Sequence, residues 1–340
     1  MKKLLNTLYV STQGIYLRQE GETLVAEFQR EVKLRLPIHT LSGIVCFGNV
    51  MCSPFLLGLC GERGIHVSFL NEYGKFLARV SGPISGNVLL RREQFRVVEN
   101  PPAACLIAKN IVLGKIANSR TVLQRLLRDH GEDERVAHAV NMLANILRRV
   151  QSVEDVDTLR GLEGEAAMHY FSVFDSLIVS QKKDFAMTVR SRRPPLDPIN
   201  TLISFLYTIL AHDCEGALEG VGLDPQMGFL HALRPGRPSL ALDLMEEFRS
   251  ILADRVAVSL INLNQINAKG FVTSESGAVM MKDDTRKEVL TAWQKKKKET
   301  ILHPFINETV EIGLLPHIQA QLLARHLRGD IDAYPPFLIK

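Results

Sequence analysis

Three acidic residues lie close together in the third quarter of this 340-residue chain, at positions 243, 246 and 247. On a helix, Asp243 and Glu246 share one face, and Glu247 lies close to it. That face borders an apolar stripe of leucine and phenylalanine. Like charges crowded beside apolar side chains are costly unless a cation neutralises them. The segment fits a cation site, and it equally fits a polar helix face whose acids pair with Arg249 or Arg237.

Two other segments each carry one residue that could join such a site. Glu163 lies between Gly161 and Gly164 in a stretch of helical periodicity, where each glycine costs about 1 kcal/mol relative to alanine. Glycine there allows another backbone or a ligand to approach closely. His231 follows an apolar run and precedes a loop rich in arginine and proline. Taken alone, a solvated carboxylate at a helix start explains Glu163, and a partly buried side chain explains His231.

Together the three segments point to one chemistry. Carboxylates and one imidazole are suitable ligands for Mg²⁺ or Mn²⁺, and Mn²⁺ tolerates the nitrogen better. Such an ion polarises a phosphodiester, lowers the pKa of an attacking water or 3′-hydroxyl, and stabilises the leaving oxygen. We therefore expect Mg²⁺ or Mn²⁺ as cofactor and a phosphodiester as substrate.

Basic residues lie near these candidates in the sequence. Arginine forks match phosphate geometry, and a basic loop beside a divalent cation indicates a nucleic-acid backbone as substrate. A solvated loop still explains any single arginine. A lysine run beside the only tryptophan, Trp293, is a second candidate strip, and a solvated helix end explains it equally well. The basic residues that we expect to contact DNA are Arg190, Arg192, Arg193, Arg234, Arg237, Lys295, Lys296 and Lys297.

Composition narrows the class of protein. Lysine and arginine total 41 against 37 acidic residues, and the net charge of +4 permits polyanion binding without demanding it. The five cysteines are odd in number and show no CxxC spacing, which argues against a disulfide framework and a cysteine zinc site. The N-terminus lacks the apolar body of a signal peptide, and no stretch approaches the ~20 apolar residues that span a bilayer. We expect a cytoplasmic protein without a membrane segment.

The first part of the chain is predicted to form short β-strands. Turn signals at residues 19–22 and 71–74 separate segments that alternate between apolar and polar residues. Ser53 and Pro54 form a helix N-cap pair, and Gly61 or Gly64 would end that helix. The pattern predicts a small β-sandwich-like domain. Its predicted strands are Leu4–Val10, Gly14–Leu17, Thr23–Phe28, Lys33–Ile38, Ile65–Leu70 and Lys75–Ser81.

Helical periodicity dominates beyond a boundary near residues 96–102. One of these helices should be capped by Asp197, with Pro198 at its first position. The chain is therefore predicted to be α+β, with an N-terminal β domain over residues 1–95 and an all-α catalytic domain over 96–340. The predicted helices are Ala103–Asp129, Asp133–Val150, Asp157–Ser180, Pro198–Gly216, Ser239–Asn264, Thr285–Lys298 and Leu314–Arg328.

Four segments occur in a characteristic order: Leu159–Gly164, Arg190–Asn200, Gly222–His231 and Leu242–Glu246. In this order they resemble the motifs of the CRISPR-associated adaptation endonuclease and integrase family, the larger, catalytic Cas protein of spacer acquisition. The resemblance spans the whole chain, including its length and its β-then-α layout. A run of motifs this long is far more specific than one short motif.

The resemblance implies roles for single residues. Glu163, His231 and Glu246 match the metal ligands of the family, and Asp243 matches a further catalytic acid. His231 could also protonate a leaving oxygen, although we favour a ligand role. Asn200 lies in the central motif, and we expect it to contact DNA.

The resemblance also implies partners. The family acts as a homodimer, which we expect to form through the N-terminal domain. It joins a small ferredoxin-like CRISPR adaptation protein and inserts double-stranded spacer precursor DNA into the repeats of a CRISPR array. The ending Gly329–Phe337 is similar to that of members from type I-C systems. Integration is attack by a 3′-hydroxyl on a phosphodiester, and cleavage is the same reaction with water as nucleophile.

Two other functions compete with this interpretation. His212-Asp213 is the dipeptide of the HD class of metal-dependent phosphohydrolases, which would need further ligands such as His169 and Asp243. Lone dipeptides recur by accident. A non-catalytic DNA-binding scaffold would keep the basic segments, but it would give the acids no reason to converge.

Overall fold

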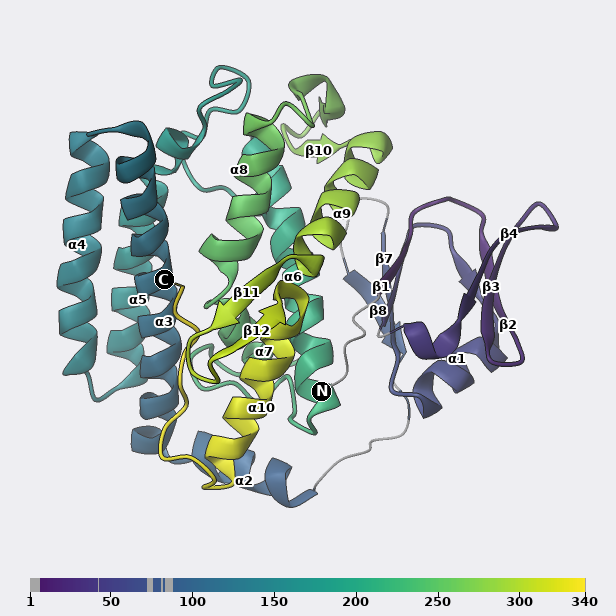
Figure 1. Ribbon diagram of the computed structural model, residues 1–340, viewed down its shortest axis with the longest axis horizontal. Coiled ribbons are helices and arrows are strands. Elements are labelled where there is room, and N and C mark those ends of the chain that lie inside the picture. The colour runs from purple at the N-terminus through teal and green to yellow at the C-terminus, as the bar shows by residue number, and fades with distance from the viewer. Residues whose placement is uncertain (1–6, 42, 72–75, 81, 83–87, 340) are drawn as a thin grey trace. The chain divides into compact units, whose positions relative to one another are not determined.

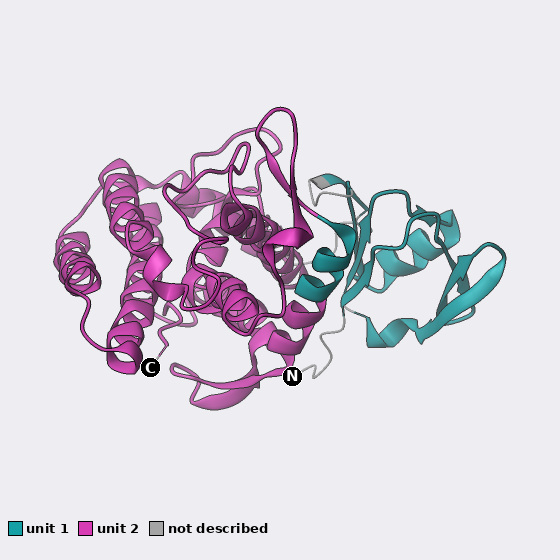
Figure 2. Ribbon diagram, turned by 90° about the horizontal axis from the view of Figure 1, so that it is seen from above, with its two compact units in different colours: residues 1–86, 282–290 teal, residues 87–281, 291–340 magenta. Residues whose placement is uncertain are grey.

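The computed structural model describes residues 7–41, 43–71, 76–80, 82 and 88–339. The chain divides into two compact units (Figures 1 and 2). One comprises residues 1–86 with 282–290, and the other comprises residues 87–281 with 291–340. Strands dominate the first unit and helices dominate the second, so the α+β class is confirmed. Within the described ranges, no helix is long and apolar enough to cross a membrane.

The first unit contains two four-stranded sheets that share one apolar core. One sheet has the order β1-β5-β7-β8, in which β7 and β8 are antiparallel and the other pairs are parallel. The second has the order β4-β3-β2-β6. Side chains from both sheets, such as Leu24 and Val67, pack around Leu56 of helix α1. The strands are β1 (Thr7–Val10), β2 (Tyr16–Glu20), β3 (Thr23–Phe28), β4 (Glu31–Pro37), β5 (Gly43–Phe47), β6 (Met51–Cys52), β7 (His66–Leu70) and β8 (Phe76–Val80).

Local signals in this unit behave as the sequence predicts. Ser53 caps α1 (Pro54–Glu62), because its hydroxyl accepts a hydrogen bond from the Leu56 N–H at 3.1 Å. Gly64 follows the helix with a φ of +66°, a conformation that favours glycine. The hairpin of β7 and β8 is confirmed. Its predicted turn and the start of the first predicted strand fall mostly outside the described residues.

The second unit is built on helices. Helices α3, α4 and α5 pack on one another, and α6 contacts α7, α8 and α10 (Figure 1). Asp197 caps α6 as predicted, since its carboxylate accepts from the Asn200 N–H at 2.7 Å. The helices of this unit are α2 (Val88–Val98), α3 (Pro101–His130), α4 (Glu134–Gln151), α5 (Val156–Phe171), α6 (Pro198–Gly220), α7 (Ser239–Met245), α8 (Asp254–Asn262) and α10 (Leu315–Leu327). Helix α9 (Asp283–Lys298) belongs to the first unit up to Leu290 and to the second from Thr291.

Helix α2 lies in the stretch that the sequence predicts as the end of the β domain, and the first unit ends before it. The buried amide of Gln94 on α2 donates to the carbonyls of Asp224 and Met227, each at 2.9 Å. These bonds tie α2 to the helical unit. Two hairpins in this unit were also not predicted, because their strands are only three or four residues long. They are β9 (Phe271–Thr273) with β10 (Val279–Met281), and β11 (Thr300–His303) with β12 (Glu308–Glu311).

Two predicted helices are shorter than expected. The one predicted to reach Ser180 ends at Phe171, because the chain then turns to bury Phe174, and the Asn262 side chain accepts from the Val179 N–H. The one predicted over Ser239–Asn264 is interrupted. It consists of α7, a tight turn at 246–248, a π-helical segment at 249–253 and α8. Such π-helical turns are frequent at functional sites.

Candidate active site

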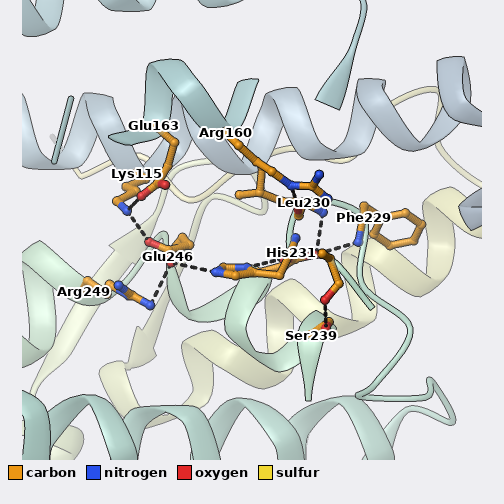
Figure 3. A network of polar contacts seen from close by, with 11 residues as sticks. Lys115, Arg160, Glu163, Phe229, Leu230, His231, Ser239, Glu246 and Arg249 are labelled. Atoms are coloured by element: carbon orange, nitrogen blue, oxygen red, sulfur yellow. Dashed lines mark hydrogen bonds and ion pairs between the residues drawn. The ribbon is translucent and has the colours of Figure 1, made fainter. Parts of the chain in front are cut away.

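Glu246 lies at the interruption between α7 and the π-helical segment, and its side chain is 2% exposed. Its Oε1 contacts the Arg249 guanidinium at 2.8 Å, and its Oε2 lies 2.7 Å from the Lys115 ammonium (Figure 3). Burial alone would raise the pKa of this carboxyl. The positive charges of Arg249 and Lys115 outweigh burial and lower the pKa to about 2. Glu246 is therefore a carboxylate at every physiological pH.

Glu163 reaches the same place from α5. Its carboxylate also pairs with Lys115, so one ammonium from α3 contacts both acids. A side chain placed at either Gly161 or Gly164 would meet no other atom within 4 Å. These glycines therefore do not accommodate a neighbouring backbone of the chain. The space next to each glycine is open.

Asp243 holds His231 in place from one turn earlier on α7. It is fully buried, and its Oδ2 accepts from the N–H groups of Phe229 and Leu230 at 2.6 and 2.9 Å. Its Oδ1 accepts from the His231 N–H at 2.9 Å and lies 2.7 Å from Nδ1 of the same residue. These contacts leave Nε2 of His231 facing Glu246 Oε1 at 3.8 Å.

Gly228 is required for this arrangement. A Cβ at this position would lie 2.8 Å from Oδ2 of Asp243 and 2.7 Å from the Ser239 carbonyl carbon. Only glycine allows the loop to approach Asp243 so closely. Asp243, which the sequence suggests as a catalytic acid, contacts His231 and its loop in this structure. It acts as a positioning residue.

The donor set suits a divalent cation. Two carboxylates and an imidazole nitrogen converge, and Oε2 of Glu246 is buried beside the Lys115 ammonium. Carboxylates and imidazole are ligands that Mn²⁺ accepts, and Mg²⁺ prefers the oxygens. In the described ranges, no three His, Cys, Asp or Glu side chains form a ready metal cage. At this site, Lys115 stands between the two acids.

Glu247 points away from this centre. Its carboxylate is fully buried and accepts from the Tyr334 hydroxyl, from the Phe337 N–H at 2.7 Å and from the Gln319 amide at 2.9 Å. Burial raises the pKa of this carboxyl to about 7, although these hydrogen bonds oppose the shift. Glu247 thus anchors the C-terminal segment, while its neighbour Glu246 faces the site.

Arg190 and Asn200 hold a loop onto α6. The Arg190 guanidinium donates to the Asn200 side-chain oxygen at 2.7 Å and lies over the rings of Phe171 and Tyr207. Asn200 is fully buried, and its amide donates to the Val189 carbonyl at 2.8 Å. The Asn200 side chain is thus covered by the protein, and Arg190 is only partly exposed. The sequence-based prediction that they contact DNA gains no support from this geometry.

The other arginines of the predicted DNA surface are accessible. Arg192, Arg193 and Arg234 are exposed, and Arg237 is half-buried. Burial lowers the pKa of the Arg237 guanidinium, and the nearby positive charges of Arg234 and Arg193 lower it further. Arg193, Arg234 and Arg237 therefore share one electropositive neighbourhood beside the His231 loop. Arg160 lies within it and donates to the Leu230 carbonyl at 2.6 Å.

The lysine strip is less uniform than its sequence suggests. Lys297 is buried, and its ammonium contacts both carboxylate oxygens of Asp213 at 2.9 Å. Trp293 is fully buried and donates to the same carboxylate at 3.3 Å. Lys295 is exposed, whereas Lys296 pairs with Glu299 at 2.5 Å. The structure thus gives Lys297 an internal role rather than a surface one.

This pairing also disfavours the HD-type alternative. Asp213 is held by Lys297, and His212 lies 3.6 Å from Glu215 on the same helix. Asp243, the acid that such a site would recruit, is committed to His231. The dipeptide therefore has no ligands assembled around it among the described residues.

Sequence reasoning missed Lys115 entirely and noted Arg249 only as an ion-pair partner. The i,i+3 spacing of Glu246 and Arg249 signals the second contact, because residues three apart are neighbours on a helical surface. No such signal exists for Lys115, which lies on α3, far from both acids in sequence.

Comparison with known proteins places these motifs in a family. The family model described as CRISPR associated protein Cas1 matches residues 8–295. The chain is 54% identical to the CRISPR-associated endonuclease Cas1 1 of Chlorobaculum tepidum over 341 residues, covering 99% of each chain. It is 55% identical to the CRISPR-associated endonuclease Cas1 2 of Rhodospirillum rubrum over 347 residues, covering 100% of each.

Solved structures share the fold. A CAS1 protein from Thermotoga maritima superposes with a TM-score of 0.83 at 25% identity, covering 96% of this chain and 97% of that one. A casposase bound to integration product matches with a TM-score of 0.83 at 24% identity, covering 97% and 92%. A chain of a Cas6-RT-Cas1–Cas2 complex matches with a TM-score of 0.84 at 22% identity, covering 99% of this chain and 36% of that chain.

Proposed function

Because the chain belongs to the family of the CRISPR-associated protein Cas1 and is an endonuclease of that family, we propose that it cuts DNA at the site built by Glu163, His231 and Glu246. The observation that carries this assignment is the convergence of the three side chains from α5, the 228–231 loop and the end of α7 (Figure 3). These three side chains would hold a Mg²⁺ or Mn²⁺ ion.

Each residue has a distinct part in the chemistry. Bound there, the ion would polarise the phosphodiester and lower the pKa of the attacking oxygen. Arg249 keeps Glu246 ionised, so the carboxylate is ready to bind a cation at neutral pH. Asp243 fixes the ring of His231 through Nδ1, which directs Nε2 toward Glu246.

Three arginines beside the site hold the DNA backbone near these groups. Arg193, Arg234 and Arg237 lie in one electropositive neighbourhood beside the His231 loop. Their forks match phosphate oxygens and neutralise backbone charge, which does not depend on base sequence. Lys295 and Lys296 remain further candidates for contacts of this kind.

We infer that the same site also joins DNA. When a 3′-hydroxyl replaces water as the nucleophile, the reaction inserts spacer DNA into a CRISPR array, without a different set of catalytic side chains. The fold shared with a casposase bound to integration product supports this inference. In cells we expect the enzyme to act in the cytoplasm on double-stranded spacer precursors and CRISPR repeats.

Partners follow from the family. One relative of this fold is part of a Cas1–Cas2 complex, and we propose that this chain likewise forms a homodimer that joins a small ferredoxin-like protein. Dimerisation through the strand-rich unit and membership of type I-C systems both stay predictions.

Nicking of supercoiled plasmid in Mn²⁺ tests the enzyme assignment. We expect Glu163→Gln, His231→Ala and Glu246→Gln each to abolish nicking, because each removes one proposed ligand. Glu165→Gln is the matched control, since Glu165 lies on the same helix and pairs with Arg149, away from the site. His212→Ala should also nick normally. Equal nicking by wild type and Glu163→Gln would contradict the enzyme assignment at this site and favour a non-catalytic DNA-binding scaffold.

A further inference from the structure

Lys115 occupies the place between the two acids of the proposed metal site. Its ammonium contacts Glu163 from one side and lies 2.7 Å from Oε2 of Glu246 on the other (Figure 3). The Lys115 side chain is 11% exposed, so water screens these charges only weakly. The single positive charge of Lys115 offsets the repulsion between the two carboxylates.

The two oxygens of Glu246 have different partners. Arg249 contacts Oε1 from the adjoining π-helical segment. Oε2 pairs with the Lys115 ammonium at 2.7 Å. Oε2 and the Glu163 carboxylate therefore share Lys115 as their cation. A divalent ion held by these two acids would need the place that the Lys115 ammonium now occupies.

An ammonium and a divalent ion cannot share that position, because they would repel strongly at such short range. A small cavity of about 20 Å³ adjoins Lys115, and its lining includes Ser119, Tyr207, Arg249, Ser250 and Asp254. This volume is enough for one water-sized group. The Ser250 hydroxyl is buried there without a hydrogen-bond partner.

We propose that Lys115 is an exchangeable internal counter-ion. Without metal, its ammonium neutralises Glu163 and Glu246; when a divalent cation binds, the ammonium leaves the acids and turns toward the cavity beside Ser250 and Asp254. The proposal rests on the metal site of the proposed function. It assigns Lys115 a role in setting metal affinity and in stabilising the metal-free enzyme, without contact to substrate.

Two consequences follow by linkage. Metal binding to the wild type must displace Lys115, so a chain without this ammonium should bind metal more tightly. The metal-free variant should in turn be less stable than the wild type, because Glu163 loses the cation that it shares with Glu246, and Glu246 keeps only Arg249. Saturating metal should remove this difference in stability, since neither protein then uses the ammonium there.

The test measures Mn²⁺ binding and unfolding rather than catalysis. Free Mn²⁺ is followed by electron paramagnetic resonance for the wild type, Lys115→Met and Lys115→Gln. We expect both variants to bind Mn²⁺ about tenfold more tightly or better, which corresponds to ~1.4 kcal/mol. Lys109→Met is the matched control, because Lys109 is also on α3 and donates to the Gln151 carbonyl away from the site. It should bind like the wild type.

Thermal unfolding gives the second readout on the same proteins. Without metal, Lys115→Met should have a lower Tm than wild type, and saturating Mn²⁺ should close the gap. The proposal is overturned if both Lys115 variants bind Mn²⁺ no more tightly than wild type, or if the gap in Tm persists at saturation. A persistent gap would identify Lys115 as a structural ion-pair partner only.

Failure of this proposal can be separated from failure of the proposed function. Glu163→Gln should weaken Mn²⁺ binding whatever Lys115 does. If Glu163→Gln binds Mn²⁺ as the wild type does, the metal site itself is wrong. If Glu163→Gln binds Mn²⁺ weakly while Lys115→Met shows no gain in Mn²⁺ affinity, the metal site is supported and only the counter-ion role of Lys115 is wrong.

Discussion

Replacing Asp243 by asparagine tests how the site orients its histidine. The change keeps shape and size but turns one acceptor into a donor. In the wild type, Oδ2 accepts two backbone hydrogen bonds, from Phe229 and Leu230. Oδ1 accepts one from the His231 N–H and faces Nδ1 of its ring. The new NH₂ group must replace one of these two oxygens.

The number of hydrogen bonds lost decides which orientation the asparagine side chain prefers. With NH₂ in place of Oδ2, two buried N–H groups lose their acceptor, at about 1–3 kcal/mol each. With NH₂ in place of Oδ1, only the His231 N–H loses its acceptor, so this orientation is preferred. The ring of His231 then accepts at Nδ1 and carries its proton on Nε2. The lone pair that faces Glu246 is lost, although no atom of the proposed ligands has been removed.

We therefore expect Asp243→Asn to weaken Mn²⁺ binding by about 10–100-fold, the usual effect of losing a residue that orients a metal ligand. It should also lower the free energy of unfolding by about 1–3 kcal/mol. Mn²⁺ titration and urea unfolding measure both effects, and ¹⁵N NMR of the imidazole reports its tautomer. Asp224→Asn is the control, since Asp224 accepts one backbone hydrogen bond, from Gln226, in the same segment. Wild-type Mn²⁺ affinity with an unchanged tautomer would refute the reasoning.

Three further predictions concern the surroundings of the site. Burial raises the pKa of Glu247 to about 7 from the usual 4.5, so its protonated form stabilises the protein fully below pH 4.5, and this stability is lost as the pH rises to 7. Glu247→Gln should abolish this loss of ~3 kcal/mol in urea unfolding from pH 5 to 8. Parallel curves of stability against pH for the variant and the wild type would contradict the prediction. Lys297→Met should destabilise the protein by about 3 kcal/mol in urea unfolding, because it leaves the mostly buried Asp213 carboxylate unpaired. Lys295→Met should change stability little, because Lys295 is exposed. Equal effects of the two substitutions would show that Lys297 is not internal. Charge reversal of Arg234 and Arg237 together should weaken DNA binding for all sequences alike and reduce the salt slope of log K by about 2, and an unchanged slope in fluorescence anisotropy would remove these residues from the DNA surface.

Local patterns predicted the parts of this fold that depend on neighbours in sequence. Ser53 and Asp197 each cap the helix that follows, because an N-cap needs only a side-chain acceptor and the next turn of backbone. The helix over Ser239–Asn264 was predicted as continuous, since its apolar periodicity runs through the interruption. The interruption coincides with nonlocal contacts, since Glu246 pairs with Lys115 and Glu247 accepts from the Tyr334 hydroxyl.

Although their role as ligands stays a prediction, Glu163, His231 and Glu246 could be singled out from sequence, because each lies in a short motif. Their environment could not. Lys115 comes from a helix that no motif connects to the acids, and Lys297 looks like a surface lysine until α9 packs it against Asp213. Charges separated in sequence become partners only when helices pack, and packing also decides whether water can screen them. The sequence alone therefore determined the residue types and helix ends, and the tertiary structure decided which charges meet and how strongly they act on one another.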